Sequence, residues 1–224
     1  MKARRIIGIL TALVMLVCLP AQTAYAAEGD PAIAETEPDL PFTDVTPDSD
    51  YYEDILFVYA NDIMNGMSST TFGEDLTLTR GMLVTILHRL EGEPVVNYAM
   101  NFTDVEPEAW YTEAIRWAAA TGIVNGYGDS LFGPDDDVTR EQLAAILYRY
   151  ANFKGYDTGI GEDTNILSYD DSSEISDWAF PAMQWACGTD VVNSGNTPAI
   201  RSAEAATRGE IAHAIRAFLE EVAE

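Results

Sequence analysis

The sequence is poor in basic residues and has almost no cysteine or histidine. Its 224 residues include 12 Lys and Arg against 37 Asp and Glu, for a formal net charge of −25 at pH 7. Nucleic-acid-binding proteins neutralise phosphates with lysine and arginine, so this balance argues against nucleic acid as a partner. It also disfavours anionic membrane surfaces. It suits a solvated protein outside the cell, where salt and divalent cations screen the charge.

The scarcity of cysteine excludes a disulfide framework. Of the two cysteines, Cys18 lies in an N-terminal apolar run that we expect to be removed, which leaves Cys187. A single thiol forms no intramolecular disulfide. Cys187 has apolar neighbours and no cation or histidine beside it in the sequence, so we interpret it as a buried structural cysteine.

The N-terminus has the composition of a secretory signal peptide. A basic segment precedes the apolar run 6–19, and an A-x-A cleavage site ends at Ala26. The run is short and ends at a proline, which disfavours a membrane anchor. We predict a signal peptide over 1–26 and a flexible acidic linker over 27–41, with no membrane contact after cleavage.

The rest of the chain repeats itself. The segment that begins at Phe42 aligns without a gap with the segment that begins at Phe102, and a more diverged copy runs from Tyr169. Phe, Asp, Asn-Gly, Phe-Gly and Thr-Arg recur in step between the first two copies. Such periodicity is typical of a repeat architecture. We predict three repeats, over 42–101, 102–160 and 161–224.

Each repeat is expected to form a helix, a loop and a second helix. In the second repeat the first helix is predicted over 110–121, with Gly122 in the left-handed conformation that ends helices. The second helix begins at Thr139, where Gln142 completes a capping box. Its apolar face recurs in every copy, and a two-helix unit cannot bury that face alone. We therefore predict a mainly α protein whose three repeats pack around a shared axis or stack.

Taken together, these motifs resemble the S-layer homology family. F-x-D-V opens a repeat, Asn-Gly follows the first helix, and a T-R-x-E-like segment opens the last helix. The resemblance covers 42–222 and implies a pseudo-three-fold bundle with grooves between neighbouring repeats. It also implies a non-catalytic module at the bacterial cell wall or cell surface. Its partner would be an anionic secondary cell-wall polysaccharide, a peptidoglycan-linked polymer that in the family often carries pyruvate.

An arginine stands at the start of each second helix. Arg80, Arg140 and Arg208 occupy a first turn, where the helix dipole disfavours a cation by up to about 1 kcal/mol. A carboxylate ligand would offset that cost, because the helix N-terminus offers N–H groups and the guanidinium offers a planar fork. The resemblance implies that these arginines lie in the grooves and meet the anionic sugar. The alternative is that each one pairs with a nearby acidic residue and fixes a loop.

The other candidate glycan-binding residues also follow from the resemblance. The early aspartates alternatively cap a turn, and the tryptophans alternatively belong to the core. The first repeat has Asp50 in place of the tryptophan, and the third has Ser194 in place of the glycine. The second repeat is therefore the best-preserved binding unit. The candidates are Asp44, Asp104 and Asp171, Trp110 and Trp178, and Gly66 and Gly126.

Other functions find less support in the sequence. The acidic cluster 135–137 lies just ahead of a helix, where acids are favourable in any protein. His88 and His213 do not align between repeats and lack metal-ligand spacing. We predict no catalytic residue, metal site or cofactor. Two alternatives stay open: a calcium-binding surface module, although the alternating calcium loop is absent, and an extracellular scaffold with a non-covalent protein cargo.

Overall fold

The computed structural model describes residues 40–159, 161, 163–192 and 198–223. These residues belong to one unit of the chain, 38–224. The predicted signal peptide lies outside the described residues, as do Ser194 and nearly all of the predicted linker.

The described part of the chain is mainly helical, which confirms the predicted fold class. Within it, each predicted repeat contributes two α-helices. Short 3-10 turns over Ile166–Ser168 and Ser172–Glu174 precede the fifth helix, and a π-helical turn over Phe218–Val222 continues the sixth. The helices are α1 (Tyr52–Ala60), α2 (Arg80–Leu90), α3 (Thr112–Ala120), α4 (Arg140–Lys154), α5 (Phe180–Gly188) and α6 (Arg208–Ala217).

The helix-terminal signals of the second repeat are confirmed in the structure. Thr139 caps α4, and its hydroxyl accepts from the backbone N–H of Gln142 while the Gln142 side chain reaches back to complete the capping box. Gly122, just past α3, has a φ of +74°. The first helix is shorter than predicted, because it begins at Thr112 instead of Trp110.

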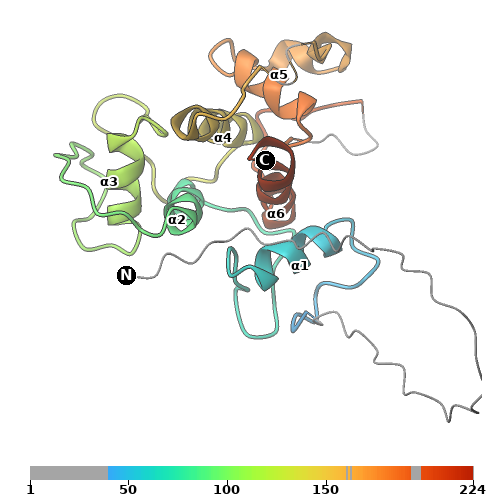
Figure 1. The fold of residues 1–224 in the computed structure, drawn as a ribbon, viewed down its shortest axis with the longest axis horizontal. Coiled ribbons are helices and arrows are strands. Elements are labelled where there is room, and N and C mark those ends of the chain that lie inside the picture. The colour runs from blue at the N-terminus through green and yellow to red at the C-terminus, as the bar shows by residue number, and fades with distance from the viewer. Residues whose placement is uncertain (1–39, 160, 162, 193–197, 224) are drawn as a thin grey trace, which may run out of the picture. The chain divides into compact units, whose positions relative to one another are not determined.

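The helices of different repeats pair with one another. The main helix contacts are α2 with α3, α4 with α5, and α6 with α1. Each second helix thus packs mainly against the first helix of the following repeat, and the third repeat returns to the first. Figure 1 shows α2, α4 and α6 on the inside of this arrangement and α1, α3 and α5 on the outside. The repeats therefore close around a shared axis within one chain.

Backbone hydrogen bonds link the repeats in the same cyclic order. The first two N–H groups of each second helix donate to carbonyl oxygens in the loop of the next repeat. The expectation that these N–H groups are open to an anion is therefore wrong. The acceptors are Asp136 and Pro134 for α2, Glu204 and Ser202 for α4, and Leu76 and Glu74 for α6.

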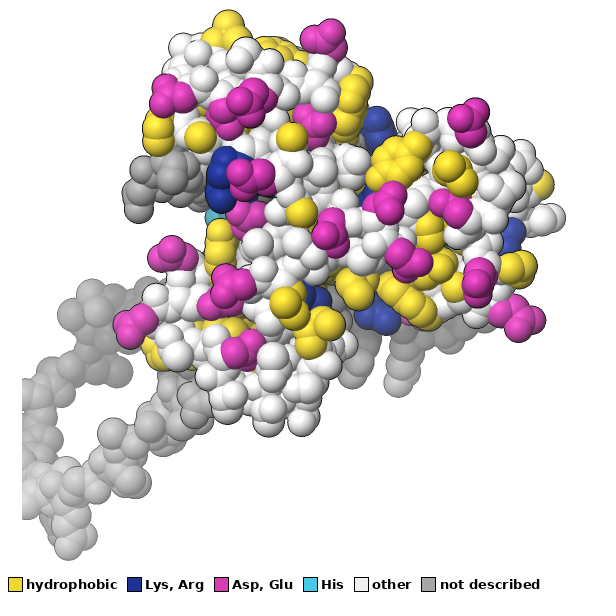
Figure 2. All heavy atoms as spheres, turned by 180° about the vertical axis from the view of Figure 1, so that it is seen from behind, with side chains coloured by type: hydrophobic (Ala, Val, Ile, Leu, Met, Phe, Trp, Pro, Cys, Tyr) yellow, Lys and Arg dark blue, Asp and Glu magenta, His cyan; other side chains and the backbone are white. Residues whose placement is uncertain are grey.

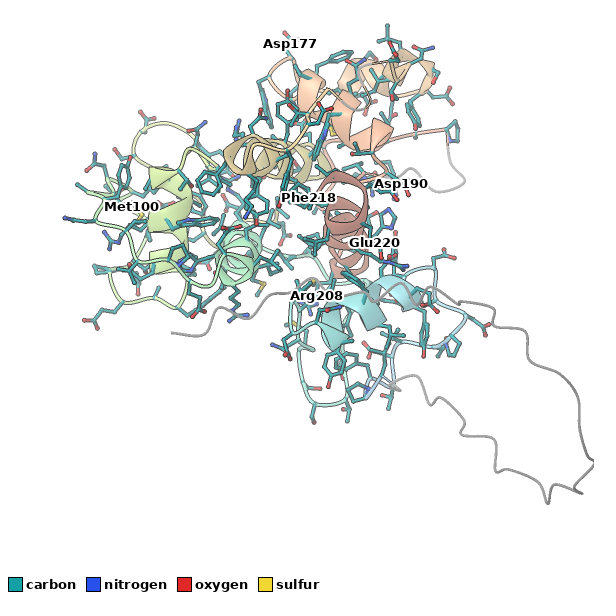
Figure 3. All side chains as sticks on the ribbon, viewed as in Figure 1. Met100, Asp177, Asp190, Arg208, Phe218 and Glu220 are labelled. Atoms are coloured by element: carbon teal, nitrogen blue, oxygen red, sulfur yellow. The ribbon has the colours of Figure 1, made fainter. Side chains whose placement is uncertain are left out.

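The core lies along the inner helices and includes two of the tryptophans. Trp117 and Trp185 are each 2% exposed and are therefore core residues. Phe218 stacks on Tyr150 with ring centroids 5.3 Å apart, and so joins the end of α6 to α4 (Figure 3). Offset-stacked rings of this kind contribute about 1 kcal/mol beyond the area that they bury.

Candidate functional site

Groove A is an open pocket lined mainly by the second repeat, with Arg80 from the first repeat and Trp178 from the third. Its volume is about 410 Å³. The exposed side of α4 forms one wall, the loop after α3 forms another, and Trp178 comes from the repeat that follows. The lining residues are Arg80, Val124, Asn125, Gly126, Tyr127, Gln142, Ala145, Ile146, Arg149 and Trp178.

Groove B is the equivalent pocket of the first repeat, with Trp110 from the second repeat and Arg208 from the third. It is smaller, at about 200 Å³. Its arginine, helix wall and tryptophan align with those of groove A, but Met82 stands where groove A has Gln142. The lining residues are Ile63, Met64, Asn65, Leu78, Met82, Thr85, Ile86, Arg89, Trp110 and Arg208.

Two of the three Thr-Arg arginines line these grooves and also bind a loop of another repeat. Arg80 is 4% exposed; its Nε donates to Phe132 O at 3.0 Å and its Nη2 to Asn125 O at 3.2 Å. Arg208 makes the corresponding bonds to Phe72 O and Asn65 O, at 2.9 and 2.7 Å. No residue in the described ranges accepts from Nη1 of either arginine. Each guanidinium thus fixes a loop through Nε and Nη2.

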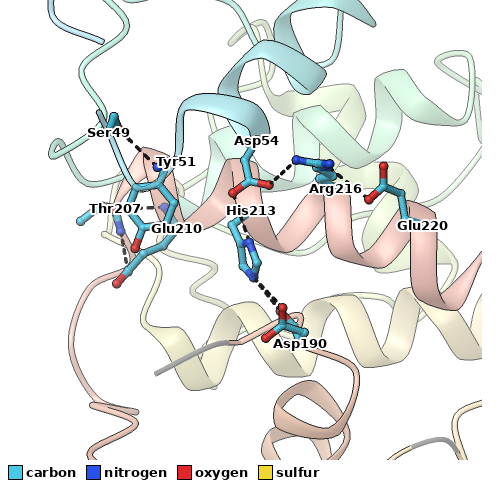
Figure 4. A network of polar contacts seen from close by, with 9 residues as sticks. All are labelled: Ser49, Tyr51, Asp54, Asp190, Thr207, Glu210, His213, Arg216 and Glu220. Carbon is cyan, nitrogen blue, oxygen red and sulfur yellow. Dashed lines mark hydrogen bonds and ion pairs between the residues drawn. The ribbon is translucent and has the colours of Figure 1, made fainter. Parts of the chain in front are cut away.

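Arg140 differs from the other two arginines. It is 3% exposed and forms an ion pair with Glu210. Glu210 also accepts from the backbone N–H of Thr207 at 3.1 Å and so completes the capping box of α6 (Figure 4). Arg140 lines neither groove A nor groove B. The alternative considered from the sequence, in which the arginine pairs with an acidic residue, therefore matches the geometry of Arg140.

The two candidate tryptophans are exposed. Trp110 is 60% and Trp178 is 54% exposed, in contrast to the core tryptophans. Trp110 lines groove B and Trp178 lines groove A. Each therefore offers an aromatic surface to a ligand in its groove.

The three candidate aspartates hold the loops of their own repeats. Asp44 accepts from the backbone N–H groups of Phe72 and Gly73, at 2.9 and 2.7 Å. Asp104 and Asp171 make the equivalent pair of contacts in the second and third repeats. Desolvation raises the pKa of Asp44, but these backbone N–H groups outweigh it and hold the pKa below its usual value. None of the three aspartates lines groove A or B.

Asp104→Asn is expected to lower the free energy of unfolding by about 2 kcal/mol, because a charge-assisted hydrogen bond to the loop becomes a neutral one or is lost. Chemical denaturation of both proteins measures this difference. Glu108→Gln removes the same charge from an exposed side chain and is the matched control. Equal loss in the two variants would refute the loop-holding geometry.

The candidate glycines are sites of close packing. A Cβ on Gly126 would lie 2.3 Å from Leu131 O and 2.7 Å from Phe102 Cε1. A Cβ on Gly66 would lie 2.4 Å from Phe42 Cε1. Both distances are too short for a real side chain. A glycine here lets the loop approach the aromatic ring that opens the repeat, and Gly126 lines groove A as well.

A third pocket, the acidic pocket, lies between α1, α6 and the end of α5. It has a volume of about 560 Å³. Its Asp50, His213 and Ala217 align with Trp178, Ala145 and Arg149 of groove A, so it lacks both the tryptophan and the second arginine. Burial raises the pKa of the Cys187 thiol in its wall to about 11. The charged residues that line it are Asp50, Glu53, Asp54, Asp190, His213, Arg216, Glu220 and Glu221.

Ion pairs tie α1 to α6 in this acidic pocket. His213 contacts Asp54 at 3.2 Å and the carbonyl of Asp190 at 2.8 Å, and Arg216 bridges Asp54 and Glu220 (Figure 4). The hydrogen bond with Asp54 raises the pKa of His213; burial opposes this, and the charges of both aspartates add to it. A protonated His213 therefore strengthens the contact that closes the repeats.

The free energy of unfolding is expected to fall as the pH rises above about 6.5. A raised pKa in the folded state contributes stability that is complete below the unfolded-state value and is lost as the pH passes the folded value. The change is expected to stay below about 1 kcal/mol, because the pair is partly exposed. Thermal unfolding from pH 5.5 to 8.5 measures it, and His213→Gln should flatten the profile. An unchanged profile in that variant would contradict the assignment.

The sequence analysis missed Arg89 and Arg149. They occupy equivalent positions on α2 and α4 and line grooves B and A. The 60-residue offset between the first two repeats pairs them, and this signal was present in the sequence. The third repeat has Ala217 at that position, so this arginine, unlike the Thr-Arg arginine, does not recur in all three repeats.

No cluster of three or more His, Cys, Asp or Glu side chains in the described ranges has the geometry to hold a metal ion. No described helix is long and apolar enough to cross a bilayer. Figure 2 shows acidic side chains scattered over the face seen there, with Lys and Arg in only a few places.

The described residues form a closed set of helix pairs with two like grooves. Comparison with known families identifies its type. Residues 41–81 and 101–144 match the S-layer homology domain. The family resemblance is thereby confirmed for the first two repeats. The third repeat stays a prediction from the sequence.

Several curated proteins are similar to this chain. An amylopullulanase of Thermoanaerobacterium thermosulfurigenes is 31% identical over 84% of the chain and 10% of its own length. A cell surface protein of Thermoanaerobacter kivui is 32% identical over 54% of the chain and 16% of its own length. The surface-layer 125 kDa protein of Lysinibacillus sphaericus is 31% identical over 51% and 10%. The chain thus spans only about a tenth to a sixth of the length of these relatives.

Proposed function

We propose that this protein is a non-catalytic cell-wall anchoring module that binds an anionic secondary cell-wall polysaccharide in grooves A and B. Its place is the bacterial cell surface, as the names of its surface-layer relatives indicate for those proteins. The relatives named as enzymes match this chain over a small share of their length. Their activities are therefore not carried over.

One observation carries the proposal: each groove combines a buried arginine with an exposed tryptophan. Arg80 lies with Trp178 in groove A, and Arg208 lies with Trp110 in groove B. The aromatic face suits the C–H surface of a pyranose, and the guanidinium suits a carboxylate. Gly126 brings the loop of groove A close enough to form its wall. In this proposal the three aspartates, Gly66 and Arg140 hold the loops and helix ends in place and do not contact the ligand.

The charge distribution also favours polymer binding in two of the three pockets. A net charge of −25 repels an anionic polymer, so binding needs local positive charge. Grooves A and B have two arginines each, whereas carboxylates predominate in the acidic pocket and Glu210 neutralises Arg140. We therefore assign polymer binding to grooves A and B.

Cosedimentation with purified wall sacculi tests this function. The protein is expected to sediment with intact sacculi and to remain in solution after chemical removal of the wall-linked polysaccharide. Sedimentation that is indifferent to this treatment would contradict the proposal. It would favour the extracellular scaffold, whose partner is a protein cargo.

A further inference from the structure

We propose that Arg149 in groove A, and Arg89 in groove B, are the residues that bind the carboxylate of the polymer directly. This inference rests on the proposed function. It adds a second arginine to each groove and gives the two arginines different roles. The buried Arg80 and Arg208 fix the loops, and the more accessible Arg149 and Arg89 recognise the charge.

The partners of the basic side chains carry this inference. In the described ranges, neither Arg149 nor Arg89 has a hydrogen bond, ion pair or ring contact with the protein. All other basic side chains there have a protein partner. Arg116, Arg140, Lys154, Arg201 and Arg216 pair with acids, and Arg80 and Arg208 bind loop carbonyls.

The lack of partners is unexpected in so acidic a chain. With 37 Asp and Glu against 12 Lys and Arg, an arginine is expected to find a carboxylate. Arg149 is half-buried, and its burial lowers its pKa, which reflects the cost of keeping a desolvated cation without an anion. Both unpartnered arginines lie at the same position of a groove. This coincidence points to an anion supplied from outside the chain.

The two arginines of groove A are also close enough to repel each other. Burial is the largest cause of the lowered pKa of Arg80; Tyr127 and Asp136 raise it, and the charge of Arg149 lowers it further, as expected for like charges in one pocket. Bringing them together costs free energy in the unliganded protein. An anionic group bound between them would relieve that cost, and the repulsion therefore favours ligands with a negative charge over neutral sugars.

The available N–H donors of each guanidinium determine these different roles. A guanidinium recognises a carboxylate best with two parallel N–H donors. Arg80 has already committed Nε and Nη2 to loop carbonyls. Arg149 has its whole planar fork available. Groove A is larger than groove B, and Arg89 is exposed where Arg149 is half-buried. We therefore expect the stronger effect at Arg149.

Binding of the released wall polysaccharide to Arg149 variants tests the inference. Two forms of the polymer serve as probes: one with intact carboxylates and one whose carboxylates have been reduced to alcohols. Arg149→Gln is expected to weaken binding of the carboxylated form about ten- to a hundredfold, with little effect on the residual binding of the reduced form. Arg149→Lys, which keeps the charge but loses the fork, should recover only part of the affinity. Arg89→Gln should give a smaller loss.

Arg116→Gln is the matched control, because Arg116 pairs with Glu113 outside both grooves. If the wild-type protein prefers the carboxylated polymer and Arg149→Gln leaves the affinity unchanged, this inference is overturned and the proposed function stays intact. A variant that loses both polymer forms equally would also overturn it, since the loss would then be structural. Wild-type protein that binds both forms equally would refute anion recognition in both proposals.

Discussion

The double variant Trp110→Ala/Trp178→Ala is expected to lose nearly all affinity for the wall polysaccharide while its stability stays close to that of the wild type. Both side chains are more than half exposed, so their removal costs the fold little. A tryptophan at the centre of a binding site contributes about 2 kcal/mol or more. The expected loss is therefore about thirtyfold per groove.

The loss for the polymer is expected to exceed the loss in either groove alone. Grooves A and B lie on one chain, and a long polymer can occupy both at once. Such two-site binding raises the apparent affinity by about a hundredfold or more over one site. Trp178→Ala alone should therefore remove most of the gain in apparent affinity that comes from binding in both grooves at once.

Tyr98→Ala is the control for this experiment. Tyr98 is 42% exposed and lies outside grooves A and B, so its loss should leave the affinity unchanged. Cosedimentation with sacculi and titration with the released polymer measure all four proteins. Unaltered binding by the double variant would show that the grooves do not hold the polymer.

Arg208→Ala is expected to cause the largest loss of stability, about 4 kcal/mol. Its guanidinium holds the carbonyl oxygens of Phe72 and Asn65, which belong to the first repeat, and it lies over the Phe72 ring at 4.6 Å. Hydrogen bonds to a charged group contribute about 1.5 to 3 kcal/mol each, and both carbonyls would lose this partner.

The position of Arg208 makes this variant a test of closure as well. Arg208 joins the third repeat to the first (Figure 3), so its loss acts where α6 meets α1. Chemical denaturation measures the stability. Arg89→Ala, which removes an arginine without a protein partner, is the control and should change the stability by less than about 0.5 kcal/mol. Similar losses in the two variants would contradict the structural role of Arg208.

The sequence was sufficient to predict the helices and their buried faces, because these depend on local patterns. Thr139 and Gln142 cap α4 as predicted, and Gly122 ends its helix in the left-handed conformation. Local patterns do not determine which helix a buried face meets. An apolar face on α2 fits α1 and α3 equally well on sequence grounds, and the pairing with α3 became apparent only in three dimensions.

The candidate site was harder to predict than the fold for a similar reason. The helix-dipole argument singled out the Thr-Arg arginines but assigned them free N–H groups, and these groups bond to the next repeat instead. Arg140 follows a threonine at the start of a helix, as Arg80 does, yet Glu210, 70 residues away, neutralises it. Partners so distant in the sequence leave no local signal. Exposure, which separates Trp178 from Trp185, likewise follows from packing between repeats.

The most direct test of the central claim is the number of binding sites on one chain. Calorimetric titration with short carboxylated fragments of the wall polysaccharide, too short to span two grooves, is expected to give two sites. Trp178→Ala should leave one site, and the double variant Trp110→Ala/Trp178→Ala none. Binding of the fragments that persists in the double variant would contradict the assignment of the polymer to grooves A and B.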